Sequence, residues 1–165
     1  MDFYQNVVID YLRADRAVFV NTECCIQPED GPNPDVCKPH WYCDAVAIDL
    51  RNGTVFLCEI SYAKKLGPLI ARLKAWSQHW PDVREALERD CKIQTNWKVR
   101  LWLFVPQDSA KPLADKLELM KGIDGAMIFE PRITSLESVQ PWKYHSWDHQ
   151  DKDTDKRDIP EAMRL

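Results

Sequence analysis

Residues 41–61 read WYCDAVAIDLRNGTVFLCEIS and contain the clearest structural signal of the chain. Two apolar segments flank Asn52-Gly53, a dipeptide that favours a tight type I′ turn because both of its central positions need positive φ. The stretch therefore predicts a β-hairpin over residues 42–62, with Asp44 on its first strand and Glu59 on its second. Two carboxylates brought together across a hairpin, beside positive charge, suit a hard divalent cation held against a phosphodiester.

The segments around this hairpin alternate between helical and extended patterns. Apolar residues at helical spacing predict helices over residues 3–13, 65–80, 82–89 and 109–121, and compact apolar runs predict strands over residues 17–20, 99–105 and 125–129. Residues 23–39 are rich in proline, aspartate, asparagine and glycine and predict a long loop. The sequence thus predicts an α/β sandwich of three-layer type with a mixed central sheet, in the order α-β-β-β-α-β-α-β.

Composition narrows the class of protein. A chain of 165 residues with 45% hydrophobic residues is typical of one globular domain, which we place at residues 1–144, followed by a charged tail at residues 145–165. It contains no apolar run of the ~20 residues that span a bilayer, and its first residues lack the pattern of a secretory signal, so we expect a cytoplasmic protein without membrane contact. A net charge of −4 argues against a protein that coats nucleic acid by bulk charge.

With Asp44 on one strand and Glu59-Ile60-Ser61 on the next, the order of elements resembles the PD-(D/E)XK nuclease superfamily, which has the restriction-endonuclease-like fold. The resemblance extends over residues 2–129. It implies a Mg²⁺- or Mn²⁺-dependent nuclease that hydrolyses DNA, with Asp44 and Glu59 as metal ligands and the carbonyl of Ile60 as a third.

Ser61 occupies the position at which the family carries lysine, and a neutral hydroxyl cannot supply that charge. Lys64 or Lys65 could reach back from the segment that follows, since a lysine stem is long and flexible. Alternatively, Lys74 or Gln78 on the next helix could face the site. Asp10 on the first helix could supply the additional acid that some members of the family place there.

Two other interpretations stay open. Asp44 could be a strand-edge residue, with Glu59 in a salt bridge to Lys64 or Arg72. Separately, the chain could be a catalytically inactive relative of the same fold that has lost the lysine and binds nucleic acid or partner proteins.

A cysteine-rich segment precedes Asp44. Cys37, His40 and Cys43 have CxxHxxC spacing, and Cys24 or Cys25 could provide a fourth ligand for a structural Zn²⁺. The alternative is a set of free thiols in a reducing compartment.

Overall fold

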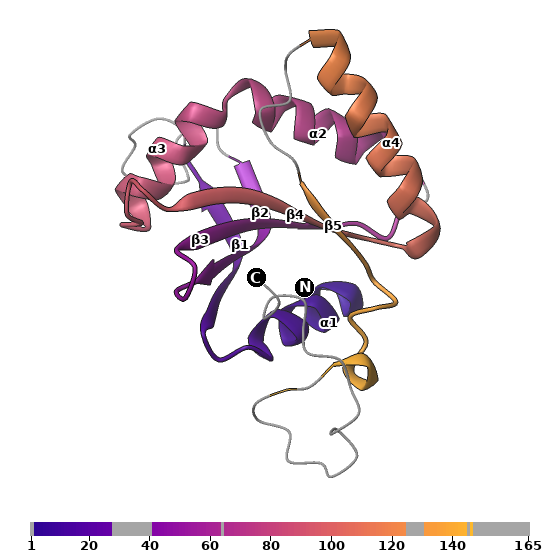
Figure 1. The fold of residues 1–165 in the computed structure, drawn as a ribbon, viewed down its shortest axis with the longest axis horizontal. Helices are drawn as coiled ribbons and strands as arrows, with labels where there is room; N and C mark the ends of the chain where they lie inside the picture. Colours follow the sequence, from indigo (N-terminus) through magenta and orange to yellow (C-terminus); the bar gives the residue numbers. More distant parts are fainter. Residues whose placement is uncertain (1, 28–40, 64, 125–130, 145, 147–165) are drawn as a thin grey trace.

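The computed structural model describes residues 2–27, 41–63, 65–124, 131–144 and 146. The elements, in chain order, are α1 (Phe3–Arg13), β1 (Val18–Ile26), β2 (Trp41–Asp49), β3 (Thr54–Ile60), α2 (Gly67–Gln78), α3 (Trp80–Asp90), β4 (Lys98–Val105), α4 (Gln107–Asp124), β5 (Arg132–Ser135) and the 3-10 helix η1 (Pro141–Lys143). The strands form one sheet in the order β1-β2-β3-β4-β5 (Figure 1). The first two pairings are antiparallel and the last two are parallel, which confirms the predicted mixed α/β sandwich.

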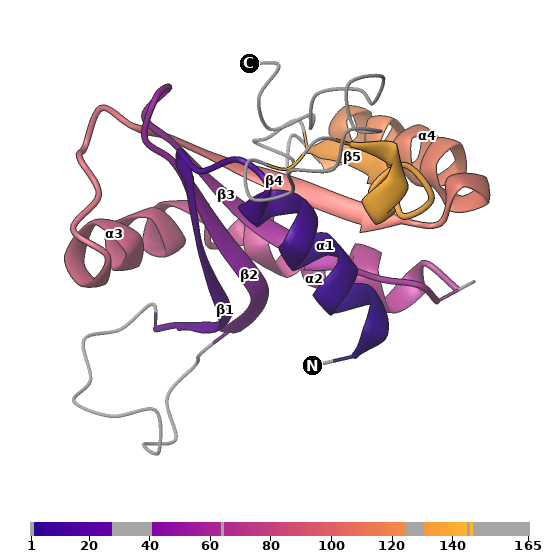
Figure 2. The ribbon, with the colours of Figure 1, turned by 90° about the horizontal axis from the view of Figure 1, so that it is seen from below.

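The sheet lies between two layers of helices, and each layer has its own core. Helices α2, α3 and α4 cover one face and α1 covers the other (Figures 1 and 2). Leu73, Leu87 and Leu113 belong to the buried cluster of the three-helix face, whereas Leu12 of α1 belongs to the opposite cluster. Strand β3 is buried along almost its whole length, as expected for a central strand of continuous apolar sequence.

The hairpin forms where the sequence predicts it, but its turn is longer. The last paired residues are Asp49 and Thr54, so the loop has four residues rather than two. Gly53 has φ of +55°, whereas Asn52 does not have positive φ, so the predicted type I′ turn is wrong. The backbone of Gly53 passes close to the Trp97 ring. A Cβ added at Gly53 would lie only 3.1 Å from two atoms of that ring.

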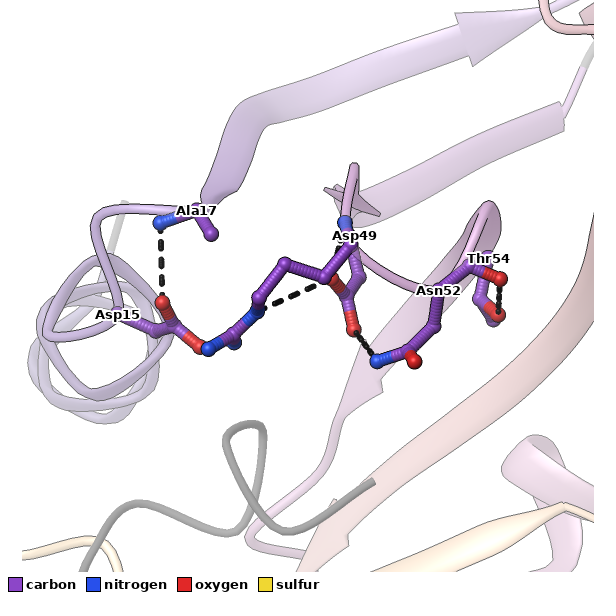
Figure 3. A network of polar contacts seen from close by, with 6 residues as sticks. Asp15, Ala17, Asp49, Asn52 and Thr54 are labelled. Carbon is purple, nitrogen blue, oxygen red and sulfur yellow. Dashed lines mark hydrogen bonds and ion pairs between the residues drawn. The ribbon is translucent and has the colours of Figure 1, made fainter.

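A polar network around two buried aspartates, Asp15 and Asp49, holds this end of the hairpin (Figure 3). Asp49 accepts hydrogen bonds from the Arg51 main-chain nitrogen at 3.0 Å and from Asn52 Nδ2 at 2.8 Å. The Arg51 guanidinium donates to Asp15, whose other oxygen accepts from the Ala17 main-chain nitrogen at 2.9 Å. One arginine therefore joins the hairpin turn to the α1–β1 corner.

Several predicted boundaries need correction. Strand β1 continues to Ile26, six residues beyond the predicted end, because its pairing with β2 overrides the weak local preference of residues 23–26. Helix α2 begins at Gly67 rather than at residue 65, with Pro68 in its first turn. The strand predicted over residues 125–129 lies outside the described residues, and β5 is the last strand among those that are described. Residues 147–165 of the predicted tail also lie outside them. No described helix is both long enough and apolar enough to cross a membrane.

Candidate metal and phosphodiester site

The two predicted acids come together where the pairing of β2 with β3 ends. Asp44 and Glu59 each lie one residue beyond the last Cα pair, Ala45 and Cys58. Asp44 Oδ2 accepts a hydrogen bond of 2.7 Å from the main-chain nitrogen of Ile60. The Asp44 carboxylate thus takes the place of a main-chain acceptor at the end of the ladder between β2 and β3. It lies beside Glu59, the residue that precedes Ile60.

A local reversal of β1 and β2 places Asp44 at this edge. Before Glu23, the side chains of Val18 and Val20 pack toward α1, whereas beyond it Ile26 packs into the opposite core. Strand β2 changes faces at the matching step, since Ala45 packs toward α1 and Cys43 packs into the opposite core. Glu23 has φ of +53°, a conformation that a residue with a Cβ seldom adopts. The reversal leaves Asp44 between the two faces, rather than inside either core.

Helix α1 holds Asp44 through Gln5. Gln5 Nε2 donates to Asp44 Oδ1 at 3.1 Å, and Gln5 Oε1 accepts from the main-chain nitrogen of Asp2 at 2.9 Å. Asp2 in turn accepts from the Gln5 main-chain nitrogen at 2.8 Å, which completes a capping box. One amide side chain therefore fixes both the start of α1 and the orientation of Asp44.

Glu59 is the most unusual residue of the site. It is 1% exposed, and neither of its carboxylate oxygens accepts a hydrogen bond from a described residue. Arg72 Nη1 of α2 lies 2.7 Å from Glu59 Oε2. The two groups form a close ion pair, but their orientation is not that of a hydrogen bond. Burial, and next the charge of Asp44, raise the pKa of Glu59 to about 8, while Arg72 acts to lower it.

The other predicted site residues are less closely assembled. Ser61 is half-buried, and its main-chain nitrogen donates to the Phe104 carbonyl at 2.9 Å, so the backbone stays paired directly after Glu59 and Ile60. Lys64 lies outside the described residues. Lys65 and Lys74 are exposed, and Lys74 is two residues from Arg72, about 200° around the helix. Asp10 and Gln78 are exposed, and the hydrogen bonds and the ion pair that the described residues make with Asp44 and Glu59 involve neither of them.

The sequence interpretation missed Gln5 and gave Arg72 no catalytic part. The Asp2-x-x-Gln5 spacing is a capping-box signal that could have located Gln5 at the start of α1. Nothing in the local sequence indicates that this helix start meets a strand 39 residues later. Arg72 was considered as a salt-bridge partner of Glu59, and that pairing is confirmed.

The zinc hypothesis rests partly on residues that are not described. Cys37 and His40 lie outside the described residues. Cys43 is buried, with its thiol 3.0 Å from the Ala45 carbonyl and 3.2 Å from the Cys58 carbonyl, and burial raises its pKa well above the ordinary value. Cys24 packs against the three-helix core, and Cys25 is its neighbour in the strand. The part of the chain that the structure describes contains no group of three or more His, Cys, Asp or Glu side chains able to hold a metal, so zinc binding stays a prediction.

Comparison of the chain with protein-family models, with curated proteins and with solved structures found no match.

Proposed function

We propose that the chain is a divalent-metal-dependent nuclease-like domain that hydrolyses DNA phosphodiesters at Asp44 and Glu59. The observation that carries this proposal is the buried Glu59 carboxyl group, which accepts no hydrogen bond from a described residue and lies beside a second carboxylate. A buried carboxyl group in this position costs free energy unless a cation or a proton compensates its charge. A bound divalent cation would provide that compensation.

The donor set fits a hard cation. The oxygens of Asp44 and Glu59 are the type of ligand that Mg²⁺ and Mn²⁺ prefer, and the Ile60 carbonyl is a further oxygen in the same segment. Two carboxylates are also enough for Mg²⁺, which usually retains several waters. A bound ion would supply positive charge to a phosphate and lower the pKa of a coordinated water.

Arg72 supplies the positive charge that Ser61 lacks. Its side chain is 45% exposed although its Nη1 lies against a buried acid, so part of this side chain remains open to solvent. A guanidinium stays charged at all working pH values and can donate two parallel hydrogen bonds to phosphate. We therefore assign to Arg72 the electrostatic role that the sequence predicts for Lys64 or Lys65, with the Ser61 hydroxyl as an additional donor.

The test is nicking of supercoiled plasmid with Mg²⁺ or Mn²⁺. Asp44→Asn and Glu59→Gln keep the shape of each side chain and are expected to remove the activity, and a chelator should do the same. Glu85→Gln is the matched control, because Glu85 is an exposed acid on α3, away from the site. Cleavage that survives both site substitutions would refute the proposal.

One observation favours a second candidate function. Arg72 already places a cation against Glu59, as expected if an arginine had replaced the metal in an inactive relative that binds nucleic acid or a partner protein. Thermal melting separates the two candidates, because a ligand that binds only the folded state raises the melting temperature. A wild-type protein that Mg²⁺ and Mn²⁺ fail to stabilise, and that cuts no DNA, would favour the inactive module.

A further inference from the structure

Exposed aromatic side chains gather beside the acid pair. Eight large apolar side chains are exposed among the described residues, and four of them are aromatic residues within three positions of Gln5, Asp44 or Glu59: Phe3, Tyr4, Tyr42 and Tyr62. The other four are Phe19, Leu50, Leu119 and Trp142. Single exposed apolar residues are ordinary on a protein surface, whereas a cluster indicates a binding site.

Three of these rings form one contact group, which we call the aromatic cluster: Phe3, Tyr4 and Tyr62. The Tyr4 and Tyr62 rings are stacked, with centroids 4.9 Å apart and an interplanar angle of 23°. Phe3 meets Tyr4 edge to face at 5.5 Å and 79°. Phe3 is 69% exposed and Tyr62 is 54% exposed. Because Tyr4 covers one side of Tyr62, this exposure leaves much of the remaining Tyr62 ring open to a ligand.

The aromatic cluster is held at a fixed place relative to the acids. Tyr4 directly precedes Gln5, which donates to Asp44. Tyr62 directly follows Ser61, whose main-chain nitrogen is bonded to Phe104. The stacked pair thus bridges the start of α1, where Gln5 holds Asp44, and the residues that directly follow β3, the strand that carries Glu59.

We infer that the aromatic cluster stacks an unpaired base of a nucleic-acid strand whose backbone passes the acid pair, so that single-stranded nucleic acid is the preferred substrate. The inference rests on the proposed function, which places the phosphodiester at Asp44 and Glu59. Base–aromatic stacking tolerates any sequence because every base has a π face. A base within a duplex is already stacked on its neighbours, so an open ring selects for unpaired strands. Arg72 and the exposed Lys65 provide positive charge for the backbone on the α2 side.

Fluorescence anisotropy with a labelled oligothymidylate and with a duplex of the same length tests this inference. The assay is run with a chelator, so that no cleavage takes place. We expect the wild-type protein to bind the single strand more tightly than the duplex, and Tyr62→Ala to weaken single-strand binding by about tenfold. Tyr62→Phe keeps the ring and should bind like the wild type. Phe19→Ala is the matched control, because Phe19 is 60% exposed and pairs with Ile48 near the opposite end of the hairpin.

Several results would overturn the inference. It fails if the single strand does not bind, if Tyr62→Ala weakens duplex binding equally, or if Phe19→Ala has the same effect as Tyr62→Ala. Sedimentation velocity adds one more test, because a wild-type dimer that Tyr62→Ala dissociates would make the cluster an interface between copies. Single-strand binding without any metal-dependent cleavage would remove the proposed nuclease activity and leave the stacking site in place. Metal-dependent cleavage of duplex DNA that Tyr62→Ala leaves unchanged would support the proposed nuclease activity and remove the stacking site.

Discussion

Arg72 Nη1 lies 2.7 Å from Glu59 Oε2, yet this guanidinium does not return the pKa of the carboxyl group to its ordinary range. The Arg72 side chain is 45% exposed and the Glu59 side chain is 1% exposed. Water therefore screens the arginine more than it screens the acid, and burial together with Asp44 outweighs the ion pair. Because this pKa lies above 7, Glu59 is mostly protonated at neutral pH, and a divalent cation that binds there would have to displace this proton.

Stability should depend on the ionisation of Glu59. Its pKa rises from 4.5 to about 8 on folding, so between these values the unfolded chain has lost a proton that the folded chain keeps. The free energy of unfolding therefore decreases as pH rises through this window. Glu59→Gln removes this pH dependence. The free energy of unfolding of the variant, relative to that of the wild type, should therefore increase by on the order of 2–4 kcal/mol between about pH 5 and pH 8. Urea denaturation at both pH values measures the difference. A gap between wild type and variant that stays constant with pH would contradict the raised pKa.

The backbone reversal at Glu23 should be sensitive to side-chain type. Because Glu23 has φ of +53°, Glu23→Val introduces a β-branched residue where the left-handed region is most costly, and we expect a loss of about 1–2 kcal/mol. Glu23→Gly accepts this conformation and should stay close to the wild type. Denaturant melts compare the two variants. Equal stability of the valine and glycine variants would show that the reversal does not need positive φ.

The hairpin and the central strands could be predicted from sequence because their signals are local. Asn52-Gly53 between two apolar segments located the hairpin, and the largely apolar run of residues 99–105 located β4. The end of β1 could not be predicted, because Glu23 is acidic and Cys24 and Cys25 have no strong preference for extended structure. Pairing with β2 decides their conformation.

In the candidate site, too, local sequence predicts some features, whereas others depend on tertiary packing. The hairpin register brings Asp44 and Glu59 to one place, and that register is set over a short stretch of chain. The contacts of Gln5 with Asp44 and of Arg72 with Glu59 instead depend on how α1 and α2 pack on the two faces of the sheet. Periodicity predicts that each helix has a buried face, but it does not tell which polar residue at the margin of that face will reach a given strand.

Gln5 should contribute more to the stability of the fold than an ordinary polar residue near a helix end. Gln5→Ala removes one half of the capping box and one hydrogen bond to Asp44, and we expect a loss of about 1–2 kcal/mol. Gln5→Glu keeps the acceptor for the Asp2 main-chain nitrogen but brings a third carboxylate to Asp44. It should be destabilising without metal, and Mg²⁺ should recover more stability for it than for Gln5→Ala. Thermal melts with and without Mg²⁺ test this, and an identical metal response of the two variants would count against a cation at Asp44.

Arg51 should be important to stability although its side chain is 46% exposed. It lies between Asp15 and Asp49, which are 1% and 0% exposed. Arg51→Ala would leave two buried carboxylates without their arginine, at an expected cost of about 3 kcal/mol. Arg51→Ala combined with Asp15→Asn and Asp49→Asn should recover part of this loss, because the neutral amides need no counter-charge. Urea denaturation of the single and triple variants measures the recovery. If Asp15→Asn and Asp49→Asn instead lower the stability of Arg51→Ala further, by as much as they lower that of the wild type, charge compensation is not the function of Arg51.

Arg72 provides the sharpest separation between a nuclease and an inactive relative. In the nuclease, the guanidinium and the metal ion compete for Glu59, so Arg72→Gln should strengthen Mn²⁺ binding several-fold while plasmid nicking decreases. In an inactive relative, the same substitution removes the only cation that faces Glu59 among the described residues and gives no metal response. Lys74→Gln is the matched control, since it makes the same change of charge on the same helix, about 200° away. Isothermal titration with Mn²⁺ measures the affinity, and the nicking assay measures the activity. Opposite changes in these two quantities, seen for Arg72→Gln and not for Lys74→Gln, are the result expected of a nuclease in which Arg72 contacts the phosphate. Parallel losses of both would assign Arg72 to holding the fold of the site instead.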